Sequence, residues 1–132
     1  MTDQPTPVAV QTDPILRAIA TRVVNADDDN HLRITLILGD GMVSGDLVSP
    51  WRWAREVSAD VRENGEGRGK EEFADLFLTI ADSPDRPQQD EKFLTSLYLI
   101  NTECWTRGLK GEDVGPVAVN LAQVSGWFLG SR

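Results

Sequence analysis

The sequence predicts an α+β fold in which an N-terminal helix precedes a small, strongly bent, five-stranded antiparallel sheet. Three observations lead to this prediction. Two runs of alternating β-forming residues flank a turn at 39–41, a helical insertion of about 50–92 follows them, and shorter β-forming segments close the chain at 117–130. In an alternative arrangement, the same strands close into a small barrel.

A chain of 132 residues can bury its own core, and we expect a single domain over 13–132 after a disordered lead-in at 1–12. The lead-in is rich in Pro, Thr and Gln and has no apolar period. Asp13-Pro14 then predicts the start of a helix. The Asp side chain can accept hydrogen bonds from the free amides of the first turn, and proline fits there because its missing N–H would have no partner within the helix. The apolar stripe of this helix is Ile15, Leu16, Ile19, Ala20 and Val23.

The segments 32–38 and 41–48 predict the first two strands. Apolar residues recur at every second position in both segments, which is the period of a strand with one face on a core. Gly39 and Gly41 suit a tight hairpin turn because glycine accepts the positive φ angles that such turns require. Gly45, inside the second strand, predicts a sharp bend or a close approach of another backbone.

The insertion is expected to contain two helices. Ser49-Pro50 predicts the start of the first helix, over 51–61, and three glycines in the stretch 63–70 predict a flexible linker. A polar loop is predicted at 83–92. The second helix of the insertion has an apolar stripe that we expect to be buried, formed by Phe73, Leu76, Phe77 and Ile80.

The third strand, predicted over 93–101, is apolar on both faces and is therefore expected at the centre of the sheet. A glycine-containing loop is predicted at 107–115. The fourth and fifth strands are predicted over 117–121 and 123–130, with a short turn near Ala122.

Acidic residues outnumber basic ones, with 21 Asp and Glu against 13 Lys and Arg, a net charge of −8 and a pI near 4.5. The resulting field repels phosphate backbones, which disfavours nucleic acid as a partner and favours a basic or neutral protein. The one cysteine cannot form an intramolecular disulfide, and the chain contains neither a signal-like start nor about 20 consecutive apolar residues. We therefore expect a cytoplasmic protein with no membrane contact.

The residues that could carry chemistry form no recognisable catalytic or metal-binding motif. His31 follows the aspartates at 27–29, but the spacing lacks the glycine and the distal glutamate of a calcium loop, and no second histidine exists for a zinc site. Cys104 and His31 could form a nucleophile and base if they met in space, although a lone cysteine after an apolar strand is more typical of a buried hydrophobe. The glycines at 65–69 do not have the spacing of a phosphate loop. We predict no catalytic residue, no metal and no cofactor.

The segment 51–55, Trp-Arg-Trp-Ala-Arg, most favours protein binding, because Trp and Arg are enriched among interface anchors. Trp53 shares a helix face with two valines and is the better candidate for the core. In the alternative interpretation, one or both tryptophans close the end of the sheet as core residues. The candidates for contact with a partner are Trp51, Arg52 and Arg55.

Trp127 is the fourth candidate for contact with a partner. The terminal strand has large apolar residues on both faces, with Trp127 on one and Phe128 on the other. An edge strand of this kind suits pairing with a second copy, so we expect self-association. Burial of this strand under the inserted helices explains the pattern equally well.

The order of elements resembles the Sm family of small barrels. Leu36, Gly41, Gly45 and Leu47 resemble the first Sm signature, with Gly41 offset by one residue, and 124–126 resembles the second. In that family a glycine permits the bending that curls a short sheet into a barrel. The helical insertion departs from the family, and its RNA-contacting residues are not recognisable here. The resemblance implies the fold more than the activity, and an RNA-binding ring stays an alternative function.

The chain also resembles the U-type accessory proteins of gas vesicles, through the segment 34–49 and the terminal segment 124–130. This resemblance implies an assembly-associated protein that acts through protein contacts, without cofactor or catalysis. The partners that it implies are further copies of the chain and the gas vesicle shell protein. A third interpretation is a small-molecule enzyme whose site is assembled from residues distant in the sequence.

Overall fold

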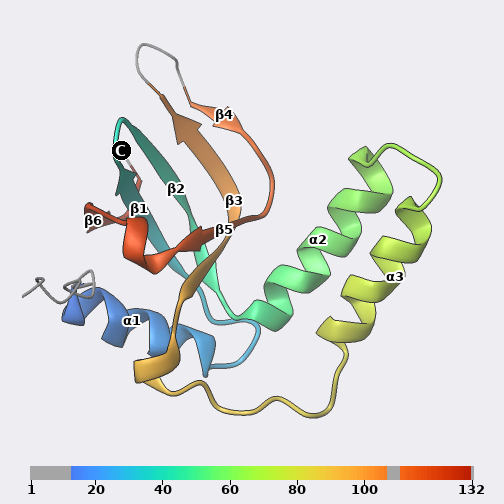
Figure 1. The fold of residues 1–132 in the computed structure, drawn as a ribbon, viewed down its shortest axis with the longest axis horizontal. Coiled ribbons are helices and arrows are strands. Elements are labelled where there is room, and N and C mark those ends of the chain that lie inside the picture. Colours follow the sequence, from blue (N-terminus) through green and yellow to red (C-terminus); the bar gives the residue numbers. More distant parts are fainter. Residues whose placement is uncertain (1–12, 107–110, 132) are drawn as a thin grey trace, which may run out of the picture.

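The computed structural model describes residues 13–106 and 111–131. It has an α+β fold with an antiparallel sheet five strands wide, an N-terminal helix and helices between the second and third strands, which confirms the predicted fold class (Figure 1). The lead-in predicted at 1–12 lies outside the described residues, as does part of the loop predicted at 107–115.

The predicted elements appear in the predicted order with shifts of their ends, but a short strand, Glu112–Asp113, lies within the segment predicted as a loop at 107–115. The third strand begins at Ser96, because a short 3-10 turn capped by Asp90 precedes it, and the last strand begins at Gly126 after a second such turn. In chain order the elements are α1 (Pro14–Val24), β1 (Leu32–Leu38), β2 (Gly41–Val48), α2 (Pro50–Asn64), α3 (Lys70–Ala81), η1 (Glu91–Phe93), β3 (Ser96–Trp105), β4 (Glu112–Asp113), β5 (Val117–Asn120), η2 (Leu121–Gln123) and β6 (Gly126–Leu129).

β3 lies inside the sheet, as its two apolar faces predict. It pairs with β2 on one side, and on the other side with β5 along its first half and with β4 near its end. β1 lies between β2 and β6, so the order across the sheet is β6, β1, β2, β3 and then β5 with β4. Within the described residues, the edge strands β5 and β6 share no ladder. The sheet is therefore open, and the alternative of a closed barrel is wrong.

Gly45 marks a close backbone approach, which was one of its two predicted roles. The register between β2 and β3 shifts between Ser44 and Asp46, which is the signature of a β-bulge. A Cβ atom built on Gly45 would lie 2.9 Å from the Thr102 Cγ2 atom and 3.1 Å from the carbonyl oxygen of Ile100. Only glycine leaves room for β3 at this point.

The hydrophobic core lies between α1 and one face of the sheet. α1 starts as predicted, since the Asp13 carboxylate accepts from the amides of Ile15 and Leu16. Its apolar side is buried against residues of four strands and of η2, except for Ile15, which is 62% exposed. The core consists of Leu16, Ala20, Val23, Val24, Ile34, Leu36, Val43, Leu47, Leu94, Leu97, Leu99, Val119 and Leu121.

α2 and α3 form a helical hairpin that projects to one side of the sheet (Figure 1). Ser49 caps α2, as predicted, by accepting from the amide of Arg52 at 3.1 Å. α2 extends to Asn64, so the connection to α3 is shorter than the linker predicted at 63–70. α2 contacts β3, whereas the extensive contacts of α3 are with α2.

Candidate protein-interaction site

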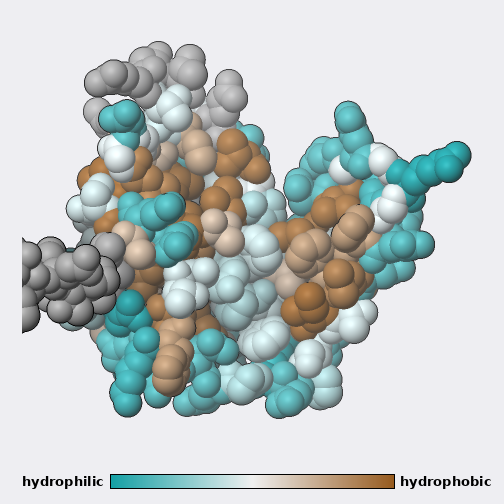
Figure 2. Space-filling view, in the orientation of Figure 1, coloured by the Kyte–Doolittle hydropathy of each residue, from teal (hydrophilic) through white to brown (hydrophobic). Residues whose placement is uncertain are grey.

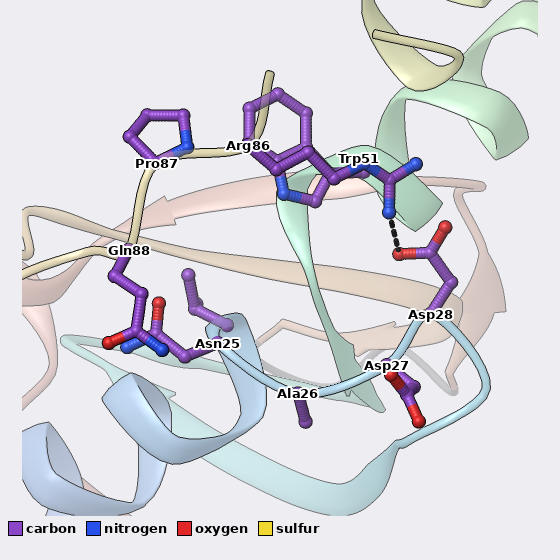
Figure 3. Close-up of a pocket in the computed structure, with 9 residues that line it drawn as sticks. Asn25, Ala26, Asp27, Asp28, Trp51, Arg86, Pro87 and Gln88 are labelled. Atoms are coloured by element: carbon purple, nitrogen blue, oxygen red, sulfur yellow. Dashed lines mark hydrogen bonds and ion pairs between the residues drawn. The ribbon is translucent and has the colours of Figure 1, made fainter. Parts of the chain in front are cut away.

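Trp51 lies in the first turn of α2, beneath the loop that follows α3. The Arg86 guanidinium lies over its indole ring, 5.5 Å from the ring centroid, and pairs with the Asp28 carboxylate at 2.9 Å (Figure 3). Arg86 also donates to the carbonyl oxygen of Ala81. A pocket of about 310 Å³ opens beside this group of residues. One face of Trp51 therefore already binds a cation of its own chain.

Arg52 and Arg55 make intramolecular contacts as well. Arg52 donates to the backbone carbonyl of Asp28 at 3.0 Å, and its Nε lies 3.5 Å from the Glu56 carboxylate. Arg55, one turn further along α2, pairs with Asp82 at the end of α3, at 2.8 Å. The structure thus places Trp51 and Arg52 near Asp28, and it places Arg55 beside the end of α3.

Trp127 is far from these three residues, on the edge strand β6. Its indole Nε1 donates to the Asp13 carboxylate at 3.1 Å, and its ring packs against the core. This hydrogen bond, together with the one from the Ile15 amide, lowers the pKa of the Asp13 carboxyl. Trp127 therefore ties β6 to the start of α1. The exposed residues of β6 are Phe128 and Leu129 instead.

The seam between α2 and α3 consists of small residues. The four fully buried side chains of the hairpin are Ala54, Ser58, Ala74 and Ala81. Ser58 also donates from its hydroxyl to the carbonyl oxygen of Ala74 at 2.7 Å across the seam. Small side chains let two helices approach closely. The rings of Trp53 in α2 and Phe77 in α3, with centroids 6.3 Å apart, add a large apolar contact between the same helices.

One flank of the hairpin is polar and carries ion pairs between the two helices. Arg62 pairs with Asp75 at 2.5 Å and with Glu71 at 3.5 Å. The pair between Arg55 and Asp82 lies further along the same two helices. Each of these pairs is exposed and contributes little to the free energy of folding.

Three large apolar residues of α3 are exposed, whereas Phe77 contacts Trp53 of α2. Phe73, Leu76 and Ile80 are 59%, 53% and 40% exposed, so the prediction that they are buried is wrong. We call these three residues the α3 apolar face. Figure 2 shows apolar surface over the hairpin, and further apolar surface over the sheet. Single exposed apolar residues are ordinary, but three at helical spacing form a patch typical of an interaction site.

Trp53 and Phe77 extend this apolar surface toward the sheet. The Trp53 ring meets Phe77 edge-on, with centroids 6.3 Å apart, and lies 5.3 Å from the ring of Tyr98 in β3. Trp53 thus packs inside the chain, as its helix position predicts. Its buried indole Nε1 has no hydrogen-bond partner among the described residues.

The residues considered for chemistry stay apart from one another. The His31 ring is exposed, with Nδ1 3.2 Å from the carbonyl oxygen of Asp29. Burial raises the pKa of the Cys104 thiol, which disfavours the reactive thiolate. Throughout the part of the chain that the structure describes, no group of three or more His, Cys, Asp or Glu side chains could hold a metal ion.

Comparison with family models, with curated proteins and with solved structures finds no match for this chain. Over the described ranges 13–106 and 111–131, none of the helices combines the length and apolar character needed to cross a bilayer.

Proposed function

We propose that this chain is a non-enzymatic accessory protein that acts through protein–protein contacts, in the formation or clustering of gas vesicles. The observation that carries the proposal is the α3 apolar face, which presents three large side chains to solvent on a projecting hairpin. Exposed apolar patches of this kind mark protein interaction sites. The gas vesicle as the assembly rests on the resemblance of 34–49 and 124–130 to the U-type accessory proteins.

The α3 apolar face is not needed to hold the hairpin together, and this supports a role in binding. The seam and the ion pairs use other side chains, which are Ala54, Ser58, Ala74 and Ala81 on the inside and arginines with carboxylates on one flank. A helix that serves only to pack on α2 would gain stability and solubility from polar residues at 73, 76 and 80. Three apolar residues at these positions favour a partner.

Binding to isolated gas vesicles tests the proposal. Purified protein is mixed with vesicles stripped of their accessory proteins, and the fraction that floats with the vesicles is measured. We expect the wild type to float with the vesicles and the Leu76→Glu variant to stay in solution, because a carboxylate on the α3 apolar face would have to lose its water on binding. Thr79→Glu places the same charge on the same helix, outside that face, and is expected to bind as the wild type does.

A wild-type protein that never floats with vesicles would overturn the gas vesicle role. Equal flotation of the Leu76→Glu and Thr79→Glu variants would overturn the α3 apolar face as the site of contact. The alternative of an RNA-binding ring predicts binding of single-stranded RNA at low salt that weakens as salt rises. We expect no such binding, since the chain carries a net charge of −8.

A further inference from the structure

α2 ends in the dipeptide Asn64-Gly65, at the tip of the helical hairpin (Figure 1). The side-chain amide of an asparagine can be attacked by the backbone nitrogen of the next residue, and a side chain on that residue hinders the attack. The chain has five asparagines, and the residues that follow the other four are Ala26, His31, Thr102 and Leu121. Because glycine has no Cβ atom, Asn64 is the asparagine least protected by its neighbour.

The fold requires glycine at position 65. A Cβ atom built on Gly65 would overlap the carbonyl oxygen of Val61 and lie 3.2 Å from its carbonyl carbon. The same oxygen accepts a hydrogen bond from the Gly65 amide at 2.9 Å, and this bond closes the last turn of α2. A larger residue would have to break the bond to find room. The helix end therefore retains the residue that leaves Asn64 open to attack.

Two hydrogen bonds occupy the reacting groups while the last turn of α2 is closed. The Asn64 side-chain amide donates to the Asp60 carboxylate at 3.0 Å, and the attacking nitrogen of Gly65 donates to Val61. The last buried residue of α2 is Ser58, whereas residues 62–64 are exposed. Exposed hydrogen bonds at the end of a helix open at a low cost in free energy. Opening of this one turn releases both reacting groups together.

We propose that Asn64 is a site of spontaneous deamidation, which proceeds when the last turn of α2 opens. The Gly65 nitrogen forms a bond to the Asn64 Cγ atom, and the bond from Cγ to the side-chain nitrogen breaks. That nitrogen leaves as ammonia with the proton from the Gly65 amide, and a succinimide ring remains. Water then opens the ring at either carbonyl and yields aspartate or isoaspartate, so water is the only reagent consumed.

The product changes the charge at the tip of the hairpin. A carboxylate at position 64 faces the Asp60 carboxylate four residues earlier, where the amide had donated a hydrogen bond. Like charges at this spacing repel, and a negative charge is unfavourable at the C-terminal end of a helix. Isoaspartate also lengthens the backbone, which displaces the Gly65 amide from Val61. We therefore expect the last turn of α2 to fray in aged protein. This modification site is distinct from the α3 apolar face and does not depend on the proposed function.

Incubation of the purified protein at mildly alkaline pH, followed by peptide mapping with mass spectrometry, tests the proposal. We expect Asn64 to convert to aspartate and isoaspartate while the other four asparagines stay unchanged. Asp60→Ala removes the acceptor of the Asn64 amide and should speed the conversion about 3-fold. Glu63→Ala is the matched control, because Glu63 is a neighbouring carboxylate without a hydrogen bond or ion pair among the described residues. This variant should convert at the wild-type rate.

An Asn64 that stays intact in the folded protein but converts in guanidinium chloride would overturn the proposal, since the last turn would then not open far enough. Conversion of Asn64 no faster than that of the other asparagines would also contradict it. Equal rates in the Asp60→Ala and Glu63→Ala variants would show that the hydrogen bond to Asp60 does not control the reaction. Hydrogen exchange at the end of α2 should be faster in aged than in fresh protein, and unchanged exchange would refute the fraying.

Discussion

Replacing Gly45 with alanine will destabilise the fold by about 2 to 3 kcal/mol. The added Cβ would lie 2.9 Å from the Thr102 Cγ2 atom and 3.1 Å from both the Ile100 carbonyl oxygen and the Leu99 Cβ atom. Thr102 cannot turn away at low cost, because it is buried and its hydroxyl donates to the carbonyl oxygen of Gly115. The bulge between β2 and β3 must therefore open, and urea denaturation followed by circular dichroism will measure the loss.

Gly69→Ala is the matched control for this prediction. Gly69 has a φ of −89°, which alanine also adopts, and its added Cβ would make only ordinary contacts with the Phe73 ring, at 3.4 Å or more. We expect a change of less than about 1 kcal/mol in this variant. Equal stability of the Gly45→Ala and Gly69→Ala variants would show that β3 does not approach β2 at Gly45 as closely as described.

Ala74→Leu will loosen α3 while leaving the sheet intact. Ala74 is fully buried in the seam, and a larger side chain must push α3 away from α2 and break the hydrogen bond from Ser58. Overpacking of this kind costs about 1 to 3 kcal/mol. Because the extensive contacts of α3 are with α2, the cost appears as local opening. Hydrogen exchange of α3 amides should accelerate roughly 5- to 150-fold, whereas β1 and β2 amides should keep their rates.

Thr79→Leu controls for the added apolar volume, because Thr79 is exposed on the same helix. We expect its α3 amides to exchange at nearly the wild-type rate. If Ala74→Leu also left the α3 amides unchanged, the small-residue seam would not be what holds the hairpin together. If it accelerated exchange throughout the sheet, the hairpin and the sheet would unfold as one unit.

The sheet was predictable from sequence because its signals are local. Alternating apolar residues over 32–38 and 41–48, glycines at the turn and a capping residue followed by proline before each of two helices all act within a few residues of chain. Gly45 could be singled out because a glycine inside a strand contributes nothing to packing. The sequence does not predict which strand approaches Gly45, because the contacting residues Ile100 and Thr102 are distant in the sequence.

The interaction site was only partly predictable. The chemistry of Trp51, Arg52 and Arg55 favours binding, but Asp28, Glu56, Asp82 and Arg86 of the same chain contact them. The spacing of the apolar residues in α3 predicts an apolar face. It does not reveal whether the surface that covers this face belongs to the same chain. One signal in the sequence could have indicated the contact between the helices. Each helix carries small residues one or two turns apart, Ala54 and Ser58 in α2 and Ala74 and Ala81 in α3, on a face other than the one with the large apolar residues.

The central claim is that the α3 apolar face is free in the single chain and covered in the working assembly. Hydroxyl-radical labelling read by mass spectrometry, residue by residue, tests it most directly. Phe73, Leu76 and Ile80 should be labelled strongly in dilute protein and lose most of their labelling on vesicles. Phe93, which is 75% exposed and lies outside the hairpin, should keep its labelling throughout. Protection of the three residues already in dilute protein, or equal labelling in every state, would contradict the claim.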